Sequence, residues 1–246
     1  MRTPSRAHRA VRQRELAPDQ LAAAWQSASL LLDYPDATLS ERLALVGQAT
    51  AALPDRVGKP LSRCAALLEA VPLEELQEDY VDTFDNRRRH NLFLTYFAHG
   101  DTRKRGVALL RFKQTYLQAG VEIDESTAAG VELPDHLCVV LEFAATVDQE
   151  AGRRLILDHR AGLELLRMAL AESRSRWAGA VEAVTATLPP LEGDDLDAVR
   201  RLAAEGPPEE EVGLTPYATP MFDPGPAAPD HSAQVVLPMP SFPGAR

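Results

Sequence analysis

Four residues in the middle of the chain have side chains that can ligate metals or transfer protons: His90, His99, Asp101 and His136. No two of the histidines have the i, i+4 spacing that places two imidazoles on one face of a helix, and no cysteine joins them. His99 and Asp101 are near enough in sequence to act as an acid-base pair, but no nucleophile can be nominated beside them. We therefore predict neither a metal site nor a catalytic site.

A concentration of positive charge between residues 86 and 121 is the second candidate for function. Eight basic residues and one acid give this segment a net charge of +7, in a chain whose net charge is −10. The basic residues are Arg87, Arg88, Arg89, Arg103, Lys104, Arg105, Arg111 and Lys113. Arginine binds carboxylates and phosphates through two parallel hydrogen bonds, so the segment predicts a site for an anion or a protein partner. A solvated helix face paired with neighbouring acids is the open alternative.

The composition of the whole chain narrows the classes of function. Its 246 residues are 45% hydrophobic, which is enough for one substantial core. The excess of 36 acidic over 26 basic residues argues against general nucleic-acid binding. No stretch approaches the roughly 18 apolar residues that a membrane-spanning helix needs, and the basic N-terminus lacks the apolar segment of a signal peptide. Two isolated cysteines, Cys64 and Cys138, are typical of a reducing compartment, so we expect a cytoplasmic protein.

Helical signals dominate the chain between its two ends. Capping residues, prolines and apolar residues at i, i+3 and i+4 predict helices over approximately 20–34, 36–53, 60–71, 72–84, 102–120, 134–145, 151–172, 174–188 and 194–204. Asp101 and Asp135 are interpreted as helix caps. The short apolar segment 91–98 has no evident partner strand, so we predict a buried helix there. The expected fold is all-α, a single helical-bundle domain over residues 16–204.

The two ends of the chain differ from this helical domain. Residues 1–15 form a basic arm, and residues 205–246 contain 10 of the 19 prolines with only scattered apolar residues. Such segments bury too little apolar surface to offset the entropy lost on ordering. We expect a disordered arm and a disordered Pro-rich tail.

Two blocks of the sequence resemble a known family. The first is YVDTFDNRRRHNLFLTYFAHGDTRKRGVALLRF (80–112), and the second is ELPDHLCVVLEFAA (132–145). Together with Trp25 and the following LLLDYP, the resemblance covers roughly residues 20–190. The family is that of the nitrate reductase molybdenum cofactor assembly chaperones, also called the delta subunit or NarJ family. Cys138 departs from its pattern, since proline is expected there in many relatives.

The resemblance implies a helical bundle of the redox-enzyme chaperone superfamily that is not an enzyme. It implies that the protein binds the immature catalytic (alpha) subunit of respiratory nitrate reductase through that subunit's N-terminal segment. The client would be held until its molybdenum-guanine dinucleotide cofactor enters, and the chaperone itself would bind no cofactor permanently. Neither nucleic-acid binding nor direct membrane insertion is expected. A stable structural subunit of a reductase complex and a small helical enzyme are the alternatives.

Joining the resemblance to the residues gives a hypothesis for the binding site. The segment from Tyr80 to Leu110 and the helix after Pro134 would form an apolar groove with a charged rim, in which the client peptide lies as an amphipathic helix. The apolar contacts would come from Tyr80, Phe84, Leu94, Tyr96, Leu110, Leu137 and Leu141. The orienting charges would be Asp85, Asp101, Arg103, Arg105 and Glu142. His99 or His136 is the candidate for pH-dependent release, because the ordinary histidine pKa is about 6.5.

Overall fold

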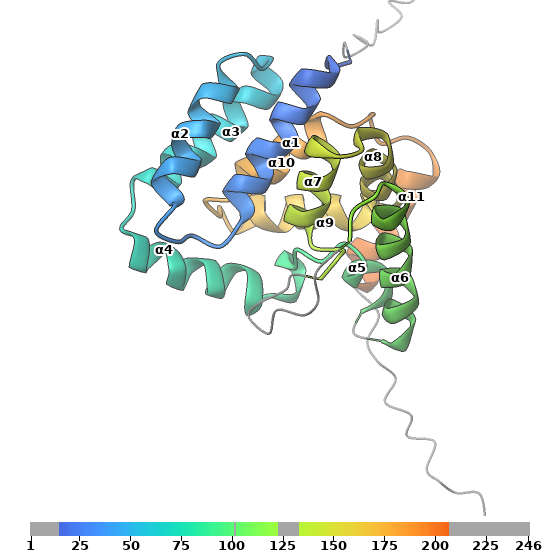
Figure 1. Ribbon diagram of the computed structural model, residues 1–246. Coiled ribbons are helices and arrows are strands. Elements are labelled where there is room, and N and C mark those ends of the chain that lie inside the picture. The colour runs from blue at the N-terminus through green and yellow to red at the C-terminus, as the bar shows by residue number, and fades with distance from the viewer. Residues whose placement is uncertain (1–14, 101, 123–132, 207–246) are drawn as a thin grey trace, which may run out of the picture. The chain divides into compact units, whose positions relative to one another are not determined.

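A computed structural model of the chain describes residues 15–100, 102–122 and 133–206, all of which belong to the first of the chain's two units, Met1–Glu210. The described residues are mostly helical (Figure 1), which confirms the predicted all-α class. The α-helices are α1 (Pro18–Leu32), α2 (Leu39–Thr50), α3 (Asp55–Glu69), α4 (Leu73–Tyr80), α5 (Tyr96–His99), α6 (Arg103–Gln118), α7 (Leu137–Thr146), α8 (Gln149–Asp158), α9 (Arg160–Glu172), α10 (Ala178–Ala186) and α11 (Asp194–Glu205). A π-helical turn, Val81–Asp85, and a 3-10 turn, Arg88–His90, follow α4.

Helix α1 organises the core, because it packs against α7, α2 and α10 (Figure 1). Its buried face carries Trp25, Ala28 and Leu32, as their spacing predicts. The indole Nε1 of Trp25 donates a hydrogen bond to Oγ1 of Thr187 at 3.0 Å. This bond joins α1 to the residue after α10, so distant parts of the sequence share one core.

Helices α3 and α10 approach closely because Gly179 faces the backbone of α3. A Cβ at this position would lie 2.3 Å from the carbonyl oxygen of Pro60. We predict that Gly179→Ala lowers the free energy of unfolding by about 1–3 kcal/mol, since the helices must separate to admit the methyl group. Chemical denaturation followed by circular dichroism measures this loss. Gly47→Ala is the control, because a Cβ there meets nothing within 4 Å, and an equal effect of the two substitutions would contradict the packing argument.

The predicted helix start at Pro60 and the predicted continuous helix over 151–172 are both wrong. Helix α3 begins at Asp55, with Pro54 as its N-cap residue, so Pro60 lies inside the helix and does not open it. The buried side chains of Val57 and Leu61 outweigh the backbone hydrogen bond that this proline cannot donate. The helix predicted over 151–172 is divided between α8 and α9 at His159, whose backbone leaves helical geometry at φ −112° and ψ 21°.

The segment 91–98, predicted as a buried helix, is extended in its first half. Phe93 forms an isolated antiparallel bridge with His136, and only Tyr96–His99 is helical. The Leu94 N–H donates to the carbonyl of Asp135 at 3.0 Å, and the Leu137 N–H donates to the carbonyl of Leu92 at 2.9 Å. The segment that pairs with residues 92–94 consists of the few residues directly before α7. It is too short to leave a strand pattern in the sequence.

Some predictions concern residues that the structure does not describe. The basic arm over residues 1–14, the tail from residue 207 and the cap at Asp101 lie outside the described ranges and stay predictions.

Both cysteines are buried and free of disulfides, and burial raises the pKa of Cys64 to about 12. In the part of the chain that is described, no helix has the length and apolarity needed to cross a membrane.

Candidate functional site

Asp135 is a buried carboxylate at the point where the two distinctive sequence blocks meet. Its side chain is inaccessible to solvent, and Oδ2 accepts the backbone N–H of Thr95 at 3.1 Å and the Thr95 hydroxyl at 2.5 Å. Nη2 of Arg105 lies 3.8 Å from the same oxygen. The predicted helix cap at Asp135 is therefore wrong: α7 begins at Leu137, and the carboxylate joins residues 91–100 to α6.

Arg105 turns inward from the basic segment. Its Nε donates to Oγ1 of Thr95 at 3.2 Å, and its guanidinium carbon lies 5.0 Å above the centre of the Phe93 ring. Only 14% of its side chain is exposed, so it holds the local fold and offers little surface to a ligand. Arg103, two residues earlier, is exposed at the start of α6.

His136 packs beside this network, with its ring centre 5.1 Å from that of Phe93. Burial lowers the pKa of His136 to about 4. The imidazole is therefore neutral at physiological pH, and the hypothesis that His136 switches client release near neutrality is wrong.

The depressed pKa of His136 makes stability depend on pH. The unfolded chain binds the proton at about pH 6.5 and the folded chain only near pH 4, so this contribution is complete above pH 6.5 and lost as the pH falls. We predict a loss of about 3 kcal/mol over this window, and a shallower pH dependence in His136→Gln. Denaturant titrations across the window compare the two slopes. Burial also lowers the pKa of His90 and His159, but these residues contribute equally to the wild type and to the His136→Gln variant. Equal slopes for the two proteins would therefore contradict the assignment of the pH dependence to His136.

Most of the apolar residues proposed for the client groove belong to the core. The buried ones are Tyr80, Phe84, Leu94, Tyr96, Leu137 and Leu141. The Tyr80 hydroxyl donates to the carbonyl of Leu32 at 2.9 Å, and its ring lies 5.5 Å from that of Trp177. Leu137 and Leu141 are fully buried on α7, which packs against α1. In this conformation the six do not line an open groove, and their contact with a peptide stays a prediction that requires helices to separate.

Leu110 differs from the other six because it is 54% exposed on α6. Val107 and Leu117 are 71% and 65% exposed, and the spacing of three and seven residues places all three on one side of the helix. The opposite side of α6 carries Phe112 and Tyr116 into the core. We call the exposed residues Val107, Leu110 and Leu117 the α6 stripe.

An open cavity of about 810 Å³ adjoins the α6 stripe. Val107, Ala108, Leu110 and Phe112 supply its apolar lining, while Lys104 and Arg111 bring positive charge. His99 and His159 also line it. The combination of an apolar ridge, an adjoining hollow and basic residues is typical of a surface that receives an apolar segment of another protein.

Helix α6 is held firmly beneath this surface. The Tyr116 hydroxyl donates to the carbonyl of Pro134 at 2.6 Å, and Arg111 forms an ion pair with Asp158 at 3.0 Å. The Phe112 ring lies 5.1 Å from that of His159. The stripe is therefore presented on a helix that three side chains hold to Pro134, Asp158 and His159.

The remaining proposed charges are spread over the surface. Asp85 and Glu142 are exposed on the π-helical turn and α7, and Asp101 lies outside the described residues. Sequence reasoning missed Val107 and Leu117 as exposed residues, although α6 carries two apolar faces that a helical wheel separates. Among the residues described, no group of three or more His, Cys, Asp or Glu side chains is arranged to hold a metal ion.

Comparison with known proteins gives the chain a family. The family model described as "Nitrate reductase delta subunit" matches residues 50–183. The nitrate reductase-like protein NarX of Mycobacterium tuberculosis (strain ATCC 25618 / H37Rv) is 44% identical over 167 residues, covering 66% of this chain and 24% of NarX. The nitrate reductase molybdenum cofactor assembly chaperone NarJ of Escherichia coli (strain K12) is 32% identical over 153 residues, covering 61% of this chain and 63% of NarJ.

Two further similarities complete the comparison. The probable chaperone NarJ of Bacillus subtilis (strain 168) is 37% identical over 115 residues, covering 47% of this chain and 60% of that protein. A crystal structure of a putative redox enzyme maturation protein from Archaeoglobus fulgidus aligns with a TM-score of 0.48 and 23% identity, covering 72% of this chain and 96% of that one. The chain spans about a quarter of NarX and less than two thirds of either NarJ protein. Because the delta subunit model matches more than half of its length, the chain belongs to the nitrate reductase delta subunit family.

Proposed function

We propose that this chain is a cytoplasmic assembly chaperone for a nitrate reductase, and not an enzyme. It binds the immature catalytic subunit at its N-terminal segment and keeps it competent for insertion of the molybdenum-guanine dinucleotide cofactor. Family membership supports this role, as do the NarJ relatives, which are molybdenum cofactor assembly chaperones by name. The buried free thiols fit a reducing compartment.

The observation that carries the proposal is the α6 stripe beside its cavity. Three large apolar residues, more than half exposed, lie on a single anchored helix of a family member. Exposed apolar patches on soluble domains commonly mark interaction sites. An amphipathic client helix would cover the stripe and insert a side chain into the adjoining cavity, as in helix-in-groove recognition.

The charged residues at the start of α6 orient the client in this proposal. Arg103 is exposed next to the stripe, and Lys104 lines the cavity. Asp85 and Glu142 stay part of the proposed site as more distant charges. The buried apolar set would join only if the segment between α4 and α6 moves outward when the client binds.

Co-expression of the catalytic subunit with and without this chain tests the function. We expect catalytic subunit made alone to contain little molybdenum and to regain it when the chain is present, because the chaperone holds the cofactor site open. Full molybdenum content without the chain would contradict the proposal. A chain that stays in equal amounts with mature, active enzyme would instead establish the alternative of a structural subunit.

A further inference from the structure

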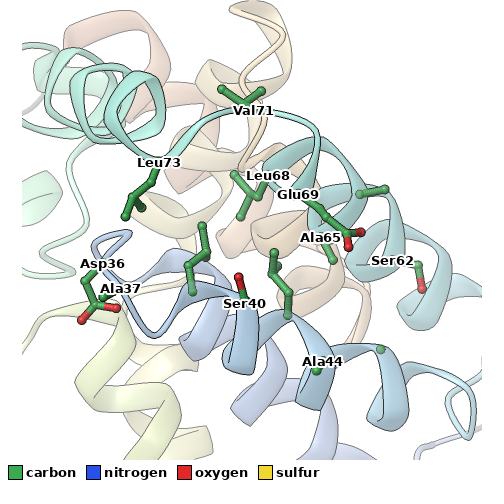
Figure 2. Close-up of a pocket in the computed structure, with 14 residues that line it drawn as sticks. Asp36, Ala37, Ser40, Ala44, Ser62, Ala65, Leu68, Glu69, Val71 and Leu73 are labelled. Carbon is green, nitrogen blue, oxygen red and sulfur yellow. The ribbon is translucent and has the colours of Figure 1, made fainter.

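Residues of α2 and α3 line a second hollow, and Figure 2 shows its lining. Its volume is about 450 Å³. Leu39 and Leu43 on α2 face Ala65 and Leu68 on α3, and Leu73 at the start of α4 closes one end. We call this hollow the α2–α3 groove. Its floor is continuous with the core, since Leu39, Leu43 and Ala65 pack against buried residues.

The walls of the α2–α3 groove are low enough for another backbone to approach. Ala44, Gly47 and Ala66 line it with the smallest side chains, and all three are exposed. A Cβ added at Gly47 would meet nothing within 4 Å. From Leu39 to Gly47 the helix rises about 12 Å, which matches roughly two turns of a third helix laid along the pair.

The charged residues that line the α2–α3 groove are both acids, Asp36 and Glu69, which lie on opposite sides of it in Figure 2. Thr38 donates both its hydroxyl and its N–H to Asp36, and these bonds lower the pKa of that carboxyl. Within the described residues Glu69 makes no ion pair. Both side chains therefore bring a carboxyl group to the rim of the groove.

Neighbouring cations do not cancel this charge. Arg42 is buried and divides its bonds among Asp33, Asp36 and two carbonyl groups. Its single positive charge balances only one of the two carboxylates, so one net negative charge is left over. Arg63 pairs with Glu182 on α10, and Lys59 pairs with Asp55 at 2.7 Å. The groove thus combines an apolar floor, small walls and a negative rim.

We propose that the α2–α3 groove is a second docking surface, whose partner is an amphipathic helix of another protein with apolar residues on one face and Lys or Arg toward both ends. The apolar face would cover Leu39, Leu43 and Leu68, and the basic ends would meet Asp36 and Glu69. This surface is separate from the α6 stripe, and the inference does not depend on the proposed client. The α6 stripe adjoins basic residues and the α2–α3 groove carries acids, so one chain could bind an acidic segment at the first surface and a basic segment at the second.

Binding of a designed probe to the full chain tests this surface. The probe is a fluorescently labelled helical peptide of about four turns, with leucines on one face and lysines toward both ends. A second peptide replaces every lysine by glutamate. We expect the lysine peptide to bind saturably and the glutamate peptide not to bind, as measured by fluorescence anisotropy.

Two variants locate the binding, each with a matched control. Gly47→Leu fills the groove, and Ala171→Leu adds a leucine at an exposed position on α9 that does not line the groove. Glu69→Lys reverses the rim charge, and Glu78→Lys makes the same change on α4 outside the groove. We expect the two groove variants to weaken the lysine peptide about tenfold while the controls bind as the wild type does.

Three outcomes would overturn the proposal. Equal weakening by groove and control variants would mean that the peptide senses only the net charge of the chain. Unchanged binding in Gly47→Leu and Glu69→Lys would place the peptide elsewhere. Tighter binding after the five arginines of residues 1–14 are replaced by glutamine would identify the chain's own arm as the occupant. None of these outcomes bears on molybdenum insertion, so they leave the proposed function standing.

Discussion

Replacing Val107 and Leu110 by serine is expected to weaken binding of the catalytic subunit's N-terminal segment by about 30-fold or more. Both side chains project from the α6 stripe, with 71% and 54% of their surface exposed. A client that covers them removes apolar area worth about 1 kcal/mol or more for each residue, and serine forfeits most of that gain. The fold itself should be unaffected, because neither side chain contributes to the core.

The control for this double substitution is Leu45→Ser. Leu45 is 55% exposed on α2, so its loss removes an apolar surface similar to that of Leu110 alone, on a different helix. Fluorescence anisotropy with a labelled client peptide measures affinity, and denaturation midpoints confirm that all variants are equally folded. Wild-type affinity in the double variant would show that the client does not bind at the α6 stripe.

Asp135→Ala is expected to lower the free energy of unfolding by about 3–5 kcal/mol, the largest single loss among these predictions. The substitution leaves the Thr95 N–H and hydroxyl without their buried acceptor. It also removes the carboxylate that balances the largely buried guanidinium of Arg105, 3.8 Å away. Unpaired buried polar groups lose their hydration without compensation, which is why the effect should be large.

Chemical denaturation followed by circular dichroism measures this loss. Asp85→Ala is the matched control, because Asp85 is an exposed carboxylate and its removal should change stability by less than about 0.5 kcal/mol. Combining Asp135→Ala with Thr95→Val should cost less than the sum of the two separate changes, since they remove parts of the same network. A stable Asp135→Ala variant would show that the network does not hold α6 against residues 91–100.

The fold class and most helices could be predicted because apolar spacing and capping residues are local signals. Helices α1, α4 and α11 occupy the predicted ranges to within a few residues. Errors occurred where tertiary contacts outweigh local preference. Pro60 lies inside α3, which packs against α10. At the break between α8 and α9, the His159 ring lies 5.1 Å from that of Phe112 on α6, a contact that no local pattern encodes.

The sequence could not separate core residues from surface residues in the candidate site, for a physical reason. Large apolar side chains form cores and binding surfaces alike, so composition did not separate Leu110, which is exposed, from Leu141, which is fully buried. The role of Asp135 depends on Thr95, 40 residues earlier in the chain, and no spacing rule connects the two. Only the arrangement of helices decides which apolar residues face solvent.

The α6 stripe also bears on how client release could work. The imidazole of His136 stays neutral at physiological pH, so this residue does not supply a switch there. Under the proposed function we expect release by competition, in which folding of the client buries the apolar segment that the stripe would cover. The affinity for the client should then be moderate, and His99, which lines the cavity beside the stripe, stays the predicted candidate for pH-dependent release.

Calorimetric titration of the purified chain with the N-terminal peptide of a nitrate reductase catalytic subunit tests whether the chain binds this client. We expect saturable one-to-one binding, with a negative heat-capacity change from burial of the α6 stripe. We also expect the Val107 and Leu110 double variant to lose most of this binding. Absence of binding across a range of pH values and peptide lengths would contradict the proposed client site.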